Sequence, residues 1–231
     1  MTEERQTISV VIPTWNEEAE LDETLRRARR VPEFREFIVV DGGSEDATTA
    51  IAERHGCRTL RASPGRGGQL RRGSEAATGD VILMLHADTW VEPDAGAAIL
   101  LCQRDARVVG GALLKEFRGR VHWLMRGGAF RCRLRMALFR RVLGDQGLFV
   151  RRETLRRIGG APDTPLMEEY EICRRLRREG RLALADSTVT TSARKFERLG
   201  VARTYLRMAW VTTLYHAGVA PERLREIYQR D

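Results

Sequence analysis

Short apolar runs alternate with longer amphipathic stretches through the N-terminal part of the chain. The apolar runs are typical of strands buried in a parallel sheet, and they predict strands over 8–12, 37–40 and 81–85, with a weaker one over 57–62. Leu21, Leu25 and Ala28 recur at helical spacing between the first two, behind a first turn rich in glutamate. Further helices are expected over 44–56 and 69–78. Alternation at this spacing predicts an α/β fold with a mostly parallel sheet flanked by helices.

The pattern becomes less regular beyond Trp90. It predicts helices over 93–103, 153–158 and 168–179, and strands over 107–117 and 182–185. Leu206, Trp210 and Leu214 stand at i, i+4 and i+8, which predicts a helix near the C-terminus. We therefore expect one α/β domain over 1–200 and a helical extension over 201–231 packed on the same domain.

The composition is that of a folded protein rather than a disordered one, with 42% hydrophobic and 31% charged residues in a chain of 231. The formal net charge is +8, and only Lys115 and Lys195 of the 40 basic residues are lysine, which leaves 38 arginines. A GC-rich genome explains such a bias, and phosphate recognition by guanidinium groups is the alternative. No zinc finger or RNA-binding aromatic pattern accompanies the charge, so we do not expect a nucleic-acid partner.

Neither a signal peptide nor a membrane-spanning helix is expected from the sequence. The N-terminus is acidic where a signal peptide is basic, and the apolar segment 208–220 is shorter than the roughly 20 residues that a span needs. The four cysteines are scattered singly, without the spacing of a zinc site or a disulfide framework. We expect a cytoplasmic protein.

Polar clusters follow three of the predicted strands at once, over 15–17, 41–43 and 86–88. Open parallel sheets bind ligands outside the carboxyl ends of their strands. The three clusters should therefore line one crevice.

His86 and Asp88 belong to the third of these clusters, and the tripeptide by itself is a weak signal. Side chains two positions apart on a strand point to the same side, so the two groups are expected to share one ion, Mg²⁺ or Mn²⁺. Such an ion would neutralise a diphosphate leaving group. The alternative is structural, with His86 bonded to backbone and Asp88 capping the helix that follows.

The loop "GRGGQLRR" exposes backbone N–H groups beside Arg66 and Arg71, a combination suited to phosphate oxygens. It has neither the Gly-Lys-Ser/Thr of a P-loop nor the position of a dinucleotide fingerprint. A solvated arginine turn is the alternative reading.

Glu168 and Glu169 open a predicted helix in "PLMEEYEICRRL". Carboxylates at a helix N-terminus are ordinary partners of the helix dipole. The functional alternative is a general base, partly desolvated beside the crevice.

Four segments in this order, "SVVIPTWNEE", "IVVDGGSEDAT", "GRGGQLRRGSEAATGDVILMLHADT" and "MEEYEICRRLRREG", resemble the motifs of the inverting family-two glycosyltransferases of the GT-A (Rossmann-like) fold. The segments "GDQGLFVRRE" and "TSARKFERLGVARTYLRMAW" are similar to a bacterial subgroup, the radical-SAM/selenodomain-associated transferases. The second of these holds Arg194, Lys195 and Phe196 roughly where some relatives carry a Gln-x-x-Arg-Trp segment.

The resemblance implies nucleotide contacts from Pro13, Trp15, Glu17 and Asp41. It implies that Asp88 matches the last Asp of the family's DXD motif, with His86 in place of the first, and that Asp88 binds the metal. Glu169 falls at the Asp of the family's Glu-Asp pair, which is the usual catalytic base. Arg66 and Arg71 would add positive charge at the diphosphate.

The resemblance therefore implies a metal-dependent inverting glycosyltransferase that moves a sugar from a nucleoside-diphosphate sugar to the hydroxyl of an unknown acceptor. One alternative is a non-catalytic nucleotide-sugar binding protein with a degenerate DXD motif, and another is a nucleotidyltransferase. The basic amphipathic segment 121–143 suggests peripheral contact with the inner face of the membrane, with a lid or dimer surface as the alternative.

Overall fold

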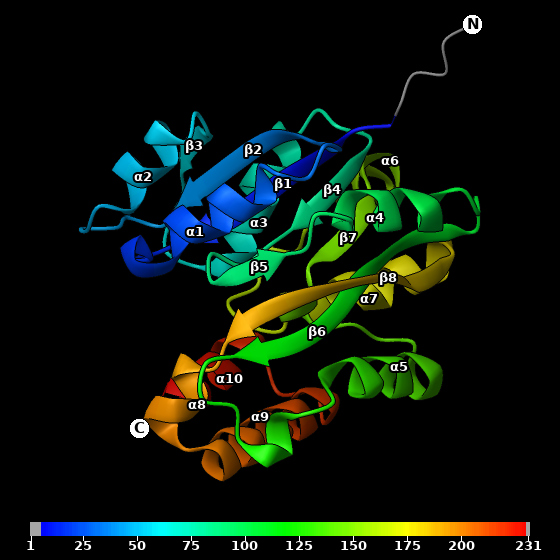
Figure 1. Ribbon diagram of the computed structural model, residues 1–231. Helices are drawn as coiled ribbons and strands as arrows, with labels where there is room; N and C mark the ends of the chain where they lie inside the picture. Colours follow the sequence, from blue (N-terminus) through cyan, green and yellow to red (C-terminus); the bar gives the residue numbers. More distant parts are fainter. Residues whose placement is uncertain (1–5, 230–231) are drawn as a thin grey trace, which may run out of the picture.

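A single eight-stranded sheet, in the order β3-β2-β1-β4-β7-β6-β8-β5, runs through the computed structural model (Figure 1). The model describes residues 6–229, without the side chains of Lys195 and Gln229. The strands are β1 Ile8–Thr14, β2 Phe34–Asp41, β3 Arg58–Arg61, β4 Val81–Met84, β5 Thr89–Val91, β6 Val108–Arg118, β7 Leu148–Arg151 and β8 Arg181–Ser192. β3, β2, β1 and β4 are parallel neighbours, whereas β7 runs antiparallel to both β4 and β6.

Helices cover both faces of this sheet (Figure 1). They are α1 Glu18–Ala28, α2 Thr48–Arg54, α3 Arg66–Ala76, α4 Ala95–Gln103, α5 Gly128–Phe139, α6 Arg152–Arg157, α7 Glu168–Glu179, α8 Arg194–Leu199, α9 Val201–His216 and α10 Pro221–Gln229, with short 3₁₀ helices η1 Trp123–Met125 and η2 Gly144–Gln146. The α/β fold predicted from the sequence is confirmed.

Side-chain alternation along the strands divides the core into two layers. In β4, Val81 and Leu83 pack in the cluster that contains residues of α1, α2 and α4, while Ile82 and Met84 pack in the cluster with α3, α6 and α7. Both layers need apolar residues, which is why the central strands read as uninterrupted apolar runs. The parallel strands β3, β2, β1 and β4 have their carboxyl ends at the same edge of the sheet.

Two strands were not predicted. β5 has only three residues and pairs antiparallel with β8, and β7 crosses between β4 and β6. Each is too short to show a period of its own. The sheet is consequently more mixed than the sequence suggested, with three antiparallel pairings beside four parallel ones.

Two polar residues of a type that commonly caps helices make other contacts here. Asn16 adopts a left-handed conformation, and its side chain accepts a hydrogen bond from the Glu45 amide, so it links two loops instead of capping α1. Ser44 donates to Asp41, and α2 begins only at Thr48. The two loops that follow β1 and β2 are thereby joined at the sheet edge.

The C-terminal helices pack against the loop before α7. Val211 of α9 and Leu224 of α10 are buried in one cluster with Met167. Across residues 6–229, the structure contains no helix with the length and apolar character required to cross a membrane.

Candidate active site

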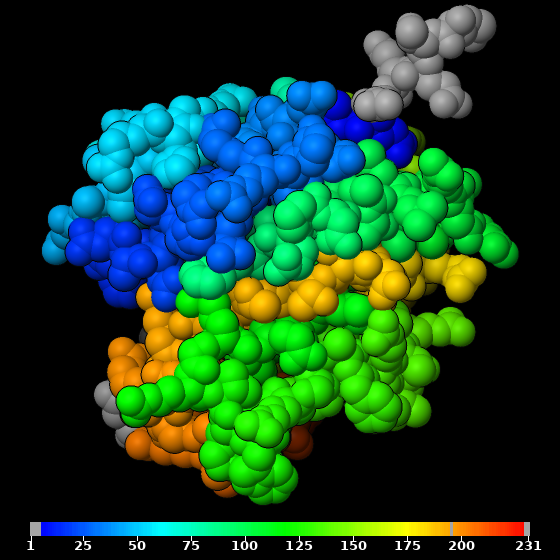
Figure 2. Space-filling view, in the orientation of Figure 1, coloured from blue at the N-terminus to red at the C-terminus, as the bar shows by residue number. Residues whose placement is uncertain are grey.

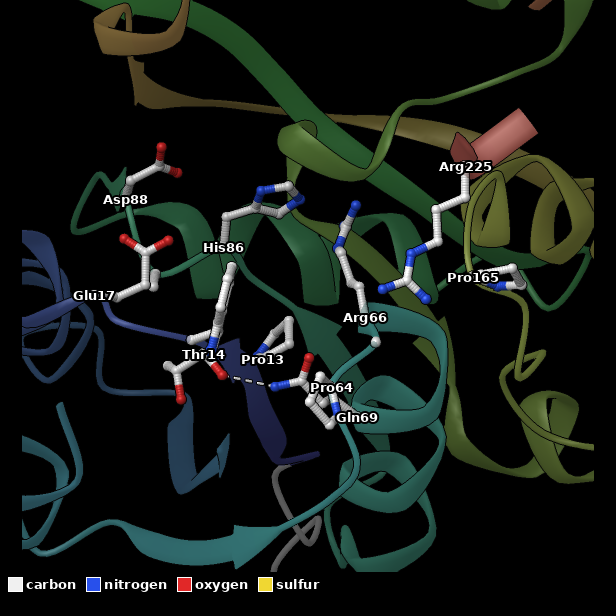
Figure 3. A pocket seen from close by; sticks show the side chains of 13 residues that line it. Pro13, Thr14, Glu17, Pro64, Arg66, Gln69, His86, Asp88, Pro165 and Arg225 are labelled. Atoms are coloured by element: carbon white, nitrogen blue, oxygen red, sulfur yellow. Dashed lines mark hydrogen bonds between the residues drawn. The ribbon is translucent and has the colours of Figure 1, made fainter. Parts of the chain in front are cut away.

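A cavity of about 460 Å³ lies at the carboxyl ends of β1 and β4 (Figure 3). Six residues singled out from the sequence line it together: Pro13, Trp15, Glu17, Arg66, His86 and Asp88. Trp15 is 63% exposed, although it is large and apolar. An exposed aromatic ring of this kind can stack on a planar ligand. Two of the three predicted polar clusters, over 15–17 and 86–88, therefore contribute to one crevice with the start of α3, whereas the cluster over 41–43 does not line it.

Asp88 and Glu17 face a common cation, the guanidinium group of Arg194 from α8. Arg194 forms an ion pair with Glu17, and its Nη2 lies 3.9 Å from Asp88 Oδ2. Burial raises the pKa of both carboxyl groups, and Arg194 opposes that rise. Removal of Arg194 from this position would leave two partly buried carboxylates in need of another cation.

A divalent ion fits this arrangement if a ligand completes its shell. Within residues 6–229 no three His, Cys, Asp or Glu side chains are grouped closely enough to hold an ion by themselves. Mg²⁺ commonly takes one or two protein carboxylates and finds its other ligands in substrate phosphates and water. Asp88, with Glu17 beside it, matches that mode of binding.

His86 does not face the same point as Asp88. β4 ends at Met84, so residues 86–88 lie in a turn, where the alternation of an extended strand no longer applies. In Figure 3 the His86 ring points toward Arg66, and the Asp88 carboxylate points away from it. The two side chains therefore do not point to one position here, and their sharing of one ion stays a prediction.

Arg66 connects the cavity to the two glutamates of α7. Its Nη1 lies 2.8 Å from Glu168 Oε1 and 3.9 Å from Glu169 Oε2. Burial and the neighbouring charge of Glu168 raise the pKa of Glu169 to about 7, with Arg66 acting in the opposite direction. A carboxyl group with that pKa can accept a proton near neutral pH, as a general base must.

A second ion pair, between Lys115 and Asp145, borders this region and was not predicted. Lys115 Nζ lies 2.6 Å from Asp145 Oδ2 and 4.3 Å from the centre of the Phe117 ring. Burial raises the pKa of Asp145, but Lys115, with smaller contributions from His86 and Arg135, holds it below its usual value. The sequence feature that distinguishes this pair is Lys115, one of two lysines in a chain whose other basic residues are arginine.

Asp41 and Arg71 lie outside the cavity lining. The Asp41 carboxylate is buried and accepts hydrogen bonds from the Gly43 and Ser44 amides, so it shapes the loop after β2. Arg71 pairs with Glu75 on the exposed side of α3. The nucleotide contacts expected of these two residues stay predictions. Because the Asp41 carboxylate is buried, it would affect a nucleotide by shaping the loop after β2.

The glycine-rich segment is the first turn of α3, which begins at Arg66 rather than at the expected residue 69. A Cβ atom on Gly67 would lie 2.4 Å from the backbone oxygen of Thr164. This glycine is therefore needed for close packing against the loop before α7. Gln69 then donates to the backbone oxygens of Thr14 and Val40, which fixes α3 beneath β1 and β2.

Two further lining residues come from distant parts of the chain. Pro165 precedes α7, and Arg225 belongs to α10 (Figure 3). Nothing in their local sequence distinguishes them from other prolines and arginines. The tertiary fold alone brings them to the cavity.

Comparison with known families agrees with this geometry. The model of "Glycosyl transferase family 2" matches residues 9–154, which include β1, the cavity loops and β7. The chain belongs to glycosyl transferase family 2. The predicted family is confirmed at this level.

Among curated proteins, this family-2 chain is 37% identical over 99 residues to an undecaprenyl-phosphate 4-deoxy-4-formamido-L-arabinose transferase of Pseudomonas paraeruginosa, covering 38% of the chain and 29% of that protein. It is 39% identical over 100 residues to the human dolichyl-phosphate beta-glucosyltransferase, covering 35% of the chain and 31% of that protein. The chain thus spans under a third of the length of these relatives.

Solved structures support the same fold over a longer range. A Pyrobaculum calidifontis mannosyltransferase in complex with GDP-Man and Mn²⁺ superposes with a TM-score of 0.71 at 19% identity, covering 98% of the family-2 chain and 69% of that structure. Glucosyl-3-phosphoglycerate synthase from Mycobacterium tuberculosis, with Mn²⁺, UDP and its product, gives 0.58 at 24% identity, covering 81% and 70%. These likenesses show the GT-A fold.

Proposed function

We propose that this protein is an inverting glycosyltransferase that moves a sugar from a nucleoside-diphosphate sugar to an acceptor hydroxyl. The observation that carries the proposal is the place of Glu169, a partly buried carboxyl group beside Arg66 and Glu168, where desolvation and the charge of Glu168 raise its pKa to about 7. It is linked through Arg66 to a cavity that also contains Trp15 and Asp88. The names of the structural neighbours, which include GDP-Man, UDP and Mn²⁺, support the donor class.

In the proposed reaction, Glu169 takes the proton of the acceptor hydroxyl as that oxygen bonds to the anomeric carbon. The bond from this carbon to the diphosphate breaks at the same time, and its electron pair leaves with the diphosphate. Arg66 offers positive charge at the cavity wall, and Trp15 a flat surface for the base. A divalent ion held by Asp88 would stabilise the negative charge of the leaving group. A single displacement of this kind inverts the anomeric configuration.

A hydroxyl acceptor fits Glu169 better than a phosphate acceptor does. The curated relatives are named as transferases to lipid phosphates, whose oxygens are already ionised near neutral pH. A hydroxyl group must lose its proton during the reaction. Glu169 can take that proton, as a general base does.

Two narrower assignments form part of the proposal. The first is membership of the radical-SAM/selenodomain-associated subgroup, which rests on the sequence resemblance of the segments around Asp145 and Arg194 alone. Residues 201–231 would extend the catalytic unit of 1–200, since Arg225 lines the cavity and Leu224 is buried against Met167; residues 230 and 231 lie outside the described part.

The pH dependence of the reaction should report Glu169. Because the base must be ionised, we expect kcat/KM to fall about tenfold per pH unit below pH 6 and to level off above pH 8. Initial rates at saturating metal between pH 4 and 9 would measure this fall in kcat/KM. A limb near pH 4.5, the usual value for glutamate, would contradict the assigned base.

Nucleotide binding can be tested without knowledge of the acceptor. We expect one of UDP, GDP, CDP or dTDP to raise the melting temperature in the presence of Mn²⁺ or Mg²⁺, and to lose most of that effect in EDTA. A rise in melting temperature that is independent of metal would favour the non-catalytic binding protein. In that case Arg194 would be the permanent cation beside Asp88. No rise with any nucleotide would contradict both functions.

A further inference from the structure

Large apolar side chains are exposed together on η1, α5 and α9. Ten large hydrophobic side chains are exposed among the described residues, and eight of them lie on these three elements. We call these eight the apolar face: Trp123, Leu124, Phe130, Leu134, Leu138, Phe139, Leu206 and Trp210. A concentration of this kind marks an interaction site, whereas single exposed apolar residues are ordinary.

The three elements lie at one end of the molecule. Figure 1 places α5, η1 and α9 at the end opposite α2 and β3, and Figure 2 shows the green surface of η1 and α5 beside the orange surface of α8 and α9. Met125 of η1 is buried in one cluster with Tyr205 and Met208 of α9. Arg131 of α5 donates to the backbone oxygens of residues 124–126. These contacts hold the elements in one unit.

Each of these three elements packs one side against the rest of the protein and exposes the other side to solvent. Cys132 of α5 is buried, whereas Phe130 is 69% and Leu138 64% exposed. Phe130, Leu134 and Leu138 stand at i, i+4 and i+8, along one side of the helix. Packing against the sheet therefore does not account for the apolar outer side.

The segments that carry the apolar face are rich in arginine and contain no carboxylate of their own, and Arg133 pairs with Asp186 of β8. Residues 117–144 contain eight arginines (118, 120, 126, 131, 133, 135, 140 and 141) and no aspartate or glutamate. α9 adds Arg203 and Arg207, again without a carboxylate. Arg120, Arg126 and Arg140 are exposed, and within residues 6–229 no ion pair joins them to a carboxylate. Two copies of this face would bring arginine against arginine, which disfavours a dimer.

From these observations we propose that the apolar face docks on an anionic lipid bilayer. Aromatic and leucine side chains on one side of a helix, bordered by arginine, are the features of helices that lie in the membrane interface. Negative headgroups meet the arginines, while the apolar side chains enter the acyl boundary. This surface is fully formed in the fold and needs no helix to cross the membrane.

The docking surface is joined directly to the candidate active site. Arg135 of α5 donates to Gln146 of η2, next to Asp145, and Glu116 of β6 accepts from the amides at the start of α5. Docking would therefore hold the region of Lys115 and Asp145 close to the bilayer. On the proposed function, which this step requires, the acceptor hydroxyl is carried by a membrane-anchored molecule.

Vesicle co-sedimentation tests the proposal, with pure phosphatidylcholine vesicles compared with vesicles that also contain phosphatidylglycerol. We expect the full chain to bind the mixed vesicles at low salt, to bind pure phosphatidylcholine poorly, and to be released as salt rises. Phe130→Ser combined with Leu138→Ser should weaken binding by about tenfold or more, because two inserted side chains are lost. Leu101→Ser is the matched control, since Leu101 is 62% exposed but lies on α4.

Other outcomes would overturn the proposal. These are failure to bind the mixed vesicles, equal loss of binding with Leu101→Ser, or a dimer in lipid-free solution that the Phe130→Ser and Leu138→Ser variant abolishes. The metal-dependent nucleotide shift, measured without lipid, should be the same in all variants. This change in melting temperature separates the docking proposal from the proposed function. A normal change without vesicle binding rejects the docking surface alone. Vesicle binding without any change in melting temperature rejects the glycosyltransferase.

Discussion

Glu169→Gln is expected to lower kcat by about 10²–10⁴-fold, the range that general bases contribute, while nucleotide binding is retained. The amide keeps the size of the side chain but cannot accept the acceptor's proton. Product formation from each candidate donor would measure kcat, and the melting-temperature shift with nucleotide and Mn²⁺ would measure binding. Glu171→Gln on the same helix is the control, because Glu171 pairs with Arg174 and Arg175.

The same substitution should stabilise the fold. The pKa of Glu169 is near 4.5 in an unfolded chain and is raised to about 7 in the fold. The contribution of this group to the free energy of unfolding therefore declines as pH rises through this interval and is lowest above pH 7. Glutamine does not ionise, and we expect the variant to gain about 1–3 kcal/mol at pH 8. A variant that is inactive but more stable would exclude misfolding as the cause. Unchanged turnover would remove Glu169 from the mechanism.

Asp88→Asn is expected to abolish the metal-dependent part of nucleotide binding and to lower kcat/KM by about 100-fold or more, since a metal at a leaving group contributes several kcal/mol. The neutral amide is a poorer ligand for a divalent ion than the carboxylate is. Titration of Mn²⁺ at fixed nucleotide, followed by melting temperature, checks the binding without a need for turnover.

Asp94→Asn provides the comparison for Asp88→Asn. Asp94 lies six residues further along and accepts a hydrogen bond from Ser187, away from the cavity lining. Its variant should respond to Mn²⁺ as the unmodified protein does. A normal Mn²⁺ response from Asp88→Asn would show that the ion, if it binds, is held elsewhere.

The order of strands and helices could be predicted because long elements carry their own periodicity. α7 begins and ends at the predicted residues, and β4 differs from its prediction by one. β5 and β7 could not be predicted, because their pairing partners are distant in sequence. The antiparallel half of the sheet is thus a property of tertiary contacts rather than of local pattern.

The residues of the candidate site likewise divide into those that the sequence predicted and those that only tertiary contacts bring together. Trp15 and Asp88 follow strands at a recognisable position, so topology alone predicted their meeting. The ion pair of Lys115 with Asp145 and the place of Arg225 depend on side-chain directions across the sheet and on the docking of α10. The direction of the His86 side chain could not be predicted from strand alternation, because β4 ends at Met84 and His86 lies beyond it.

The pairing of β5 with β8 has a consequence for folding kinetics. β5 follows Asp88 directly, and Thr89 pairs with Thr191, a partner about a hundred residues later in the chain. Contacts between such distant residues form late, because a long loop must close before they are gained. During synthesis or refolding, the β1-β2-β3 part of the sheet can assemble first, because its strands are close together in sequence. The turn that carries Asp88 should then be among the last parts of the sheet to become protected from hydrogen exchange.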